Sequence, residues 1–127
     1  MWRMGFAALA LAAGAAAAEP PAKVAGVSPG IVDGATAHKL VANGVKVVDV
    51  RTPAEFATGH VPGAINIPHD EMEKRFAEVG PPSTPVLVYC KTGRRSAIAA
   101  GVLKEKGFST LYDMQAYDRW VESEPRR

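Results

Sequence analysis

The sequence predicts an α/β fold with a mainly parallel sheet, and two features support this prediction. Short apolar segments typical of buried strands alternate with amphipathic, helix-like segments between residues 33 and 122, an order that favours parallel strands joined by helices. The only cysteine, Cys90, follows the apolar run 85–89 and precedes a glycine-containing loop and a helix-like stretch. Functional sites in such sheets lie beyond the carboxyl ends of the strands, and Cys90 is predicted to lie there.

Each element in the first half of the chain has a local signal. Asp33 is a good helix cap, Asn43-Gly44 is a good helix end, and Gly59 follows a short apolar turn. In chain order the sequence predicts a helix after Asp33 that ends at Asn43-Gly44, a buried strand at 45–50, and a helical turn at 53–58 that Thr52 caps.

The second half of the chain continues the alternation. Pro62-Gly63 and Pro68 bound a short strand, and Gly80-Pro81-Pro82 ends a segment of helical period. The predicted elements are a strand at 64–67, a helix at 70–79, the strand that ends at Cys90, a helix at 96–106, a brief strand at 111–112 and a helical turn at 116–122.

The amino-terminal region is expected to lie outside the fold. Residues 1–18 contain Arg3, an apolar stretch at 5–17 and small residues at 16–18, a pattern typical of a cleaved signal peptide and too short for a comfortable membrane span. Residues 19–30 are rich in proline, alanine and glycine and are expected to form a flexible arm. Residues 31–127 then form one domain, in a periplasmic or secreted protein without stable membrane insertion.

Composition excludes several classes of function. A formal net charge of +2 is too small to indicate nucleic-acid binding. A single cysteine provides no internal disulfide, and no set of cysteine and histidine residues has the spacing of a metal site. We therefore expect no metal and no cofactor, and a monomer that acts on small molecules.

The surroundings of Cys90 favour a reactive thiol. Backbone N–H groups at a loop and a helix amino terminus, together with nearby cations, stabilise a thiolate, which is the nucleophilic form of sulfur. The same groups would hold an anionic substrate. The candidate binding residues are Lys91, Thr92, Gly93, Arg94, Arg95 and Ser96. If the Arg95 guanidinium faces the loop, it can stabilise the thiolate and the bound anion together. The alternative is a buried core cysteine without chemistry.

Several ordered motifs resemble the rhodanese-like sulfurtransferases. They are Asp49-Val50-Arg51, Glu55-Phe56, the run from Gly59-His60-Val61-Pro62-Gly63 to Pro68, the run Tyr89-Cys90-Lys91-Thr92-Gly93-Arg94-Arg95-Ser96, and Gly107-Phe108. The resemblance covers nearly all of residues 19–127, and the export signal is similar to that of small phage-shock-type members.

The resemblance implies both a fold and a chemistry. It implies a five-stranded parallel sheet with helices on both faces, and a Cys90 persulfide that carries sulfur between two half-reactions. The implied partners are a small anionic donor such as thiosulfate, a cyanide or thiol acceptor, and in one version a protein acceptor. The chain departs from the family at 113–120, where members commonly have a Gly-Gly pair and this chain has Gln115-Ala116.

Other functions remain as alternatives. A low-turnover sulfur carrier or protein-binding module would share the fold. A phosphatase or arsenate reductase would also use a thiolate in an anion cradle, but related phosphatase loops have an arginine six positions after the cysteine, where this chain has Ser96. A cysteine protease needs a histidine beside the thiol, and nothing in the sequence places His60 there.

Four polar residues before the cysteine are expected to support the site structurally. Asp49, Arg51 and Glu55 are expected to form a charged network at the end of a strand, because buried charges are normally paired. His60 is expected to fix its loop through a hydrogen bond rather than to act as a general base.

Overall fold

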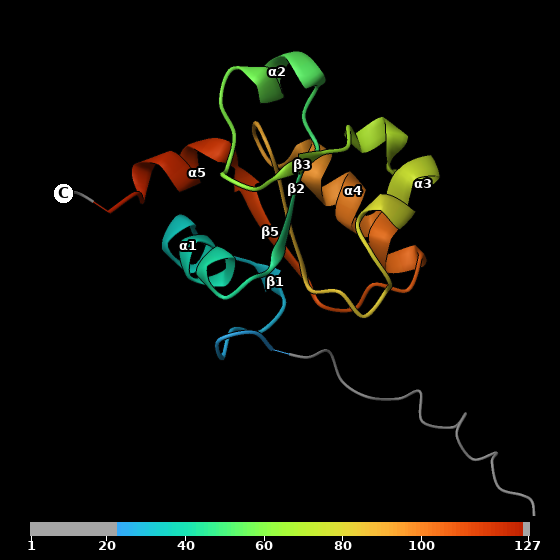
Figure 1. The fold of residues 1–127 in the computed structure, drawn as a ribbon, viewed down its shortest axis with the longest axis horizontal. Coiled ribbons are helices and arrows are strands. Elements are labelled where there is room, and N and C mark those ends of the chain that lie inside the picture. Colours follow the sequence, from blue (N-terminus) through green and yellow to red (C-terminus); the bar gives the residue numbers. More distant parts are fainter. Residues whose placement is uncertain (1–22, 126–127) are drawn as a thin grey trace, which may run out of the picture.

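The computed structural model describes residues 23–125, which form a five-stranded parallel sheet (Figure 1). The order across the sheet is β1-β5-β4-β2-β3, so β4 is central. This confirms the predicted parallel α/β architecture. The strands are β1 (Gly30–Ile31), β2 (Lys46–Asp49), β3 (Ile65–Asn66), β4 (Val86–Cys90) and β5 (Leu111–Ala116).

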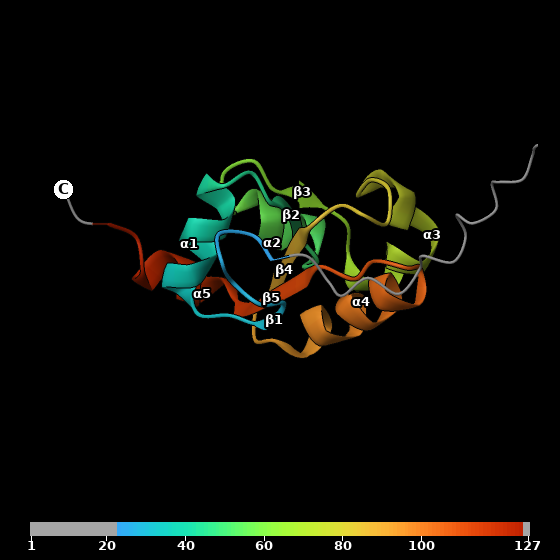
Figure 2. The same ribbon diagram turned by 90° about the horizontal axis from the view of Figure 1, so that it is seen from below.

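Helices cover both faces of the sheet (Figure 2). They are α1 (Gly34–Ala42), α2 (Pro53–Ala57), α3 (Met72–Arg75), α4 (Arg94–Glu105) and α5 (Tyr117–Glu122). Two begin with the predicted caps: Asp33 accepts a hydrogen bond from the Thr36 N–H at 2.8 Å, and Thr52 forms a capping box with Glu55. Each cap satisfies N–H groups that a helix start leaves unpaired.

Two hydrophobic cores lie on opposite faces of the sheet. The first includes Leu40 of α1 and Trp120 of α5, and the second includes Met72 of α3 and Leu103 of α4. The side chains of β4 alternate between them, because successive residues of a strand point to opposite faces. Leu87 and Tyr89 therefore belong to the first core, whereas Val86, Val88 and Cys90 belong to the second.

The structure differs from the sequence prediction at three elements. Residues 70–79 are not one helix but two 3-10 turns, η2 (His69–Glu71) and η3 (Phe76–Glu78), on either side of α3. Helix α4 begins at Arg94 instead of residue 96. Strand β5 continues four residues beyond the predicted end at residue 112, and it contains an irregularity where Val88 pairs with Asp113 and Tyr89 with Gln115.

The expected flexible arm is partly attached to the domain. Val24 and Val27 form an antiparallel bridge, and the Tyr112 hydroxyl accepts from the Val24 N–H and donates to the Val27 carbonyl. Gly30, expected in the arm, begins β1 and pairs with β5. The correction concerns residues 24–30; the predicted signal peptide at 1–18 lies outside the described residues. Within residues 23–125, no helix is long and apolar enough to cross a membrane.

Candidate active site

Cys90 is the last residue of the central strand β4, at the carboxyl end of the sheet. Its side chain is free and fully buried. The Sγ atom accepts a hydrogen bond from the backbone N–H of Gly93 at 2.9 Å. An N–H donor directed at the sulfur stabilises negative charge that develops on it during a reaction.

Gly93 allows the loop to turn back toward the sulfur. Its φ of 111° lies in a region that favours glycine, and it is the N-cap of α4. The chain therefore leaves β4, turns over three residues and enters a twelve-residue helix. The Ser96 hydroxyl donates to the Gly93 carbonyl at 3.1 Å and holds this turn to the first turn of α4.

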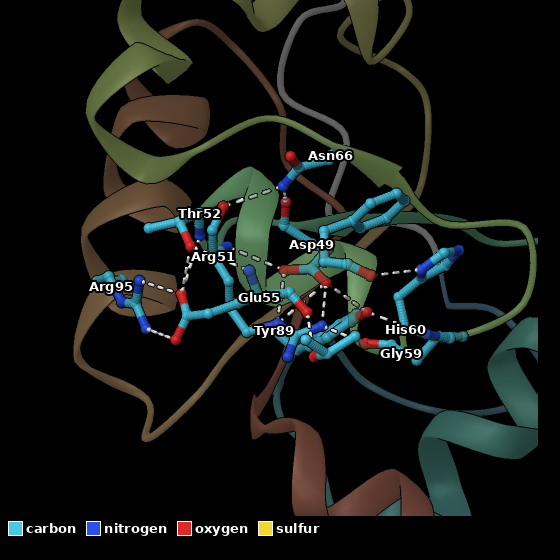
Figure 3. A network of polar contacts seen from close by, with 12 residues as sticks. Asp49, Arg51, Thr52, Glu55, Gly59, His60, Asn66, Tyr89 and Arg95 are labelled. Atoms are coloured by element: carbon cyan, nitrogen blue, oxygen red, sulfur yellow. Dashed lines mark hydrogen bonds and ion pairs between the residues drawn. The ribbon is translucent and has the colours of Figure 1, made fainter.

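Arg95 connects the loop to α2. Its guanidinium donates to both carboxylate oxygens of Glu55, at 2.8 and 3.1 Å (Figure 3). These hydrogen bonds, the Thr52 N–H and hydroxyl, and the Arg95 charge lower the pKa of Glu55 to about 2, although burial acts in the opposite direction. The pKa of Arg95 is raised, chiefly by Glu55 and also by attraction to Cys90. Arg95 thus binds Glu55 and remains within electrostatic range of the sulfur.

A buried ion pair lies beneath this end of the sheet. Arg51 donates to both oxygens of Asp49, with the shortest contact at 2.6 Å, and also to the Gly59 carbonyl at 2.7 Å. Burial disfavours the Arg51 charge, but the hydrogen bond and attraction to Asp49 outweigh burial and raise its pKa. The guanidinium also lies over the Tyr117 ring, at 4.7 Å from the centroid.

Tyr89 joins this ion pair to the central strand (Figure 3). Its hydroxyl donates to Asp49 at 2.8 Å and accepts from the Val61 N–H at 3.0 Å. Burial raises the pKa of Tyr89, and the negative charge of Asp49 raises it further. The hydroxyl of Tyr89 therefore keeps its proton, which it needs in order to donate to Asp49.

His60 belongs to the loop after α2. Its Nδ1 lies at hydrogen-bond distance, 2.9 Å, from the Phe56 carbonyl oxygen, and its ring stacks on the Phe56 ring with centroids 3.7 Å apart. Both contacts fix the loop to α2. They give His60 the structural surroundings that the sequence analysis expected.

Apart from His60, the predicted site residues separate into four groups. Cys90, Gly93 and Ser96 form the turn itself, whereas Lys91, Thr92 and Arg94 are exposed on it. Asp49 and Arg51 pair with each other. Glu55 does not join them directly but pairs with Arg95, because α2 presents its first turn to the start of α4.

Sequence reasoning missed two residues of this region, Tyr89 and Gln115. Tyr89 belongs to the apolar run and to the cysteine motif, but neither pattern indicates its hydrogen bonds to Asp49 and Val61. Strand alternation places its side chain on the face opposite Cys90. Gln115 lies against Gly93: a Cβ on that glycine would be 3.1 Å from the Gln115 Cβ. Its signal in the sequence was Gln115-Ala116 itself, at the place where the family resemblance predicted a Gly-Gly pair.

A family model for the rhodanese-like domain matches residues 34–123. The chain belongs to the rhodanese-like domain family. This confirms the resemblance based on the sequence motifs, and it places the whole of the sheet except β1 within the family match.

Two curated relatives and one solved structure are similar to this rhodanese-like chain. Thiosulfate sulfurtransferase PspE of Escherichia coli is 43% identical over 63 residues, which are 49% of this chain and 61% of that protein. A sulfurtransferase of Allochromatium vinosum is 35% identical over 71 residues, 56% of this chain and 65% of that protein. The chain therefore covers less than two thirds of either relative.

The structural neighbour is a rhodanese with anions from E. coli. It has a TM-score of 0.56 and 35% sequence identity, and the match covers 58% of this chain and 88% of that one. The agreement supports the five-stranded α/β fold. In the described part of the chain, no group of three or more His, Cys, Asp or Glu side chains is arranged to hold a metal ion.

Proposed function

We propose that the protein is a sulfurtransferase that carries a sulfane sulfur on Cys90. The observation that carries the proposal is the Cys90 Sγ at the end of the central strand, bound by the Gly93 N–H at 2.9 Å. Membership of the rhodanese-like family and the names of two relatives as sulfurtransferases support the same chemistry. Thiosulfate is the proposed donor because a small dianion suits a turn with basic side chains.

The proposed reaction has two balanced steps. In the first, the Cys90 thiolate attacks the outer sulfur of thiosulfate; a new S–S bond forms, the bond to the sulfonate sulfur breaks, and sulfite leaves with the electron pair. In the second, a cyanide ion or a thiolate attacks the outer sulfur of the persulfide and restores the Cys90 thiolate. Dividing a transfer in this way is covalent catalysis.

The loop residues have different proposed roles in these steps. The Gly93 N–H stabilises the negative sulfur. Lys91 and Arg94 are exposed and attract an anionic donor, an effect that added salt should weaken. The position six residues after Cys90 is buried Ser96, bonded to the Gly93 carbonyl. The side chain there therefore supplies no guanidinium for a phosphate, which argues against a phosphatase or an arsenate reductase.

Sulfur loading of Cys90 tests the proposal directly. After incubation with thiosulfate, intact-mass measurement should show one added sulfur atom on the wild-type protein and none on Cys90→Ser. Cyanide should remove the added sulfur and release thiocyanate. Lys39→Ala, an exposed substitution on α1, is the control and should load normally. Full turnover by Cys90→Ser would disprove the proposal.

A low-turnover sulfur carrier or binding module is the second candidate. The fully buried side chain of Cys90 favours it, because a buried sulfur exchanges slowly with free thiols. A carrier would load sulfur but turn over slowly with cyanide, and it would transfer sulfur rapidly to a protein acceptor. Comparing these two rates on the same loaded sample separates the candidates.

We also propose that the protein is exported to the periplasm or secreted. The proposal is based on the charged, apolar and small-residue pattern of residues 1–18. Protein recovered from the periplasm should have the intact mass of a chain that begins near Glu19. A mature mass that still includes Met1 would contradict this proposal.

A further inference from the structure

Gln115 has a backbone conformation that side chains rarely adopt. Its φ is 72°, in the left-handed region that favours glycine. The residue follows the irregularity of β5, where Val88 pairs with Asp113 and Tyr89 with Gln115. Its N–H donates to the Asp113 carboxylate at 2.8 Å, which holds the backbone in this turn. Strain of this kind persists where the surrounding structure requires it and is concentrated at functional sites.

This conformation places the Gln115 side chain against the cysteine loop. Built on Gly93, a Cβ would be 3.1, 3.5 and 3.7 Å from the Cβ, Cγ and Cδ atoms of Gln115. The side chain of Gln115 therefore extends along Gly93, whose N–H donates a hydrogen bond to the Cys90 sulfur. Cys90 itself is fully buried, so a reagent must pass the groups around this turn to reach it.

The carboxamide at the end of this side chain is not used by the fold. Within residues 23–125 it has no hydrogen-bond partner in the protein, and the residue is half-buried. A side-chain amide offers two N–H donors. The Gln115 Cδ would lie 3.7 Å from a Cβ built on Gly93, so the carboxamide is close to the cysteine loop.

We propose that Gln115 is a specificity-determining residue that admits a small, oxyanion-bearing sulfur donor to Cys90 and excludes a bulky one. The inference rests on the proposed sulfur transfer and deepens it. The methylene groups of Gln115 occupy the space beside Gly93, which restricts large donors. Its carboxamide donates to an oxygen of the sulfonate group of thiosulfate, the part that leaves as sulfite.

Two variants separate the steric effect from the hydrogen bond. Gln115→Gly removes both and suits the positive φ. Gln115→Met keeps a side chain of similar length and the same backbone strain but has no N–H donors, so it is the matched control. Both variants are compared with the wild-type protein in sulfur loading from thiosulfate and from glutathione persulfide. Both are also compared in alkylation of Cys90 by small iodoacetamide and by bulky fluorescein maleimide.

Substituting Gln115 should change the preference of the protein between bulky and small reagents. In Gln115→Gly, the maleimide-to-iodoacetamide rate ratio should rise by about tenfold, because steric exclusion by a few atoms has that size. The kcat/KM for glutathione persulfide relative to thiosulfate should rise as well. In Gln115→Met, the alkylation ratio should stay at the wild-type value, whereas KM for thiosulfate should rise by about tenfold at unchanged kcat.

The result that overturns the inference differs from the one that overturns the function. If wild-type protein takes up sulfur and Gln115→Gly shows the wild-type alkylation ratio and donor preference, Gln115 does not determine specificity. A wild-type KM for thiosulfate in Gln115→Met would overturn the role of the carboxamide. If wild-type protein takes sulfur from neither donor, the proposed function fails, and the alkylation ratios still decide the steric role of Gln115.

Discussion

The carboxylate of Asp49 is fully buried, and its bonding explains how a charge is tolerated below the cysteine loop. A buried charge is costly unless it is paired and hydrogen-bonded. Arg51 supplies the opposite charge, the Arg51 N–H donates to Asp49 at 2.9 Å, and the Tyr89 hydroxyl donates to it at 2.8 Å. This residue-scale network binds the end of β2 to β4 one residue before Cys90.

Removing the Tyr89 hydroxyl should measurably destabilise the protein. In Tyr89→Phe, Asp49 loses a donor and the buried Val61 N–H loses its acceptor. An unsatisfied buried group costs about 1–3 kcal/mol, so the free energy of unfolding in urea should fall by about that amount. Tyr117→Phe removes the same atom from a ring stacked on Tyr89, and its hydroxyl has no hydrogen bond within residues 23–125. Equal losses in both variants would contradict this explanation.

At the scale of elements, the α2 helix is fixed to the start of α4 by one ion pair. Glu55 closes the capping box of α2 through the Thr52 N–H and also binds the Arg95 guanidinium. Both side chains are about one quarter exposed, at 28% and 23%. The same carboxylate therefore stabilises the α2 start and orients the first turn of α4, which follows the cysteine loop.

The Glu55 pKa predicts a pH dependence of stability. Because folding lowers this pKa from 4.5 to about 2, the unfolded state binds the proton more tightly. The stabilisation is therefore present above pH 4.5 and is lost as the pH falls toward 2. Glu55→Gln should lower the free energy of unfolding by about 1 kcal/mol at neutral pH, the size expected for a partly exposed pair. The difference from the wild type should shrink as the pH falls below 4.5.

Urea unfolding over this pH range measures the effect. Glu78→Gln is the control, because Glu78 pairs with Arg75, three residues earlier, and does not connect α2 to α4. The Glu78→Gln variant should keep the ion pair between Glu55 of α2 and Arg95 of α4. A wild-type pH profile in Glu55→Gln would show that Glu55 does not cause the dependence.

The elements that the sequence predicted well are those with strong local signals. The caps at Asp33 and Thr52 and the apolar run before Cys90 depend on neighbouring residues alone, and the structure has all three. Strand β1 is only two residues long and depends on pairing with β5, 82 residues later in the chain, as in the pair Gly30–Tyr112. No local pattern could indicate it.

The site was predictable to a similar degree. The position of Cys90 and the loop after it followed from one strand, one glycine and one helix. The partner of Glu55 did not, because Arg95 is 40 residues away in the sequence and the ion pair depends on how two helices meet. The position of Gln115 over Gly93 likewise results from an irregular strand pairing, which depends on tertiary structure rather than on local sequence.

For the whole molecule, the decisive feature is that the central strand β4 contributes side chains to both cores. The fully buried β4 contributes Leu87 and Tyr89 to the core under α1 and α5, and Val88 and Cys90 to the core under α3 and α4. The nucleophile thus belongs to one core, and the tyrosine that binds the ion pair belongs to the other. Loss of packing on either face should disturb the same strand, and with it the position of Cys90.

Cooperative unfolding of the two cores is therefore expected. Leu103→Ala truncates a fully buried side chain in the α3 and α4 core, which should cost about 2–5 kcal/mol. Trp120 lies in the opposite core, and in a Trp2→Phe background it is the only tryptophan of the chain. Its fluorescence should shift to lower urea together with the helical circular dichroism signal. If Trp120 kept its original midpoint while the helical signal shifted, the cores would be independent, and β4 would not couple the packing of one face to the other.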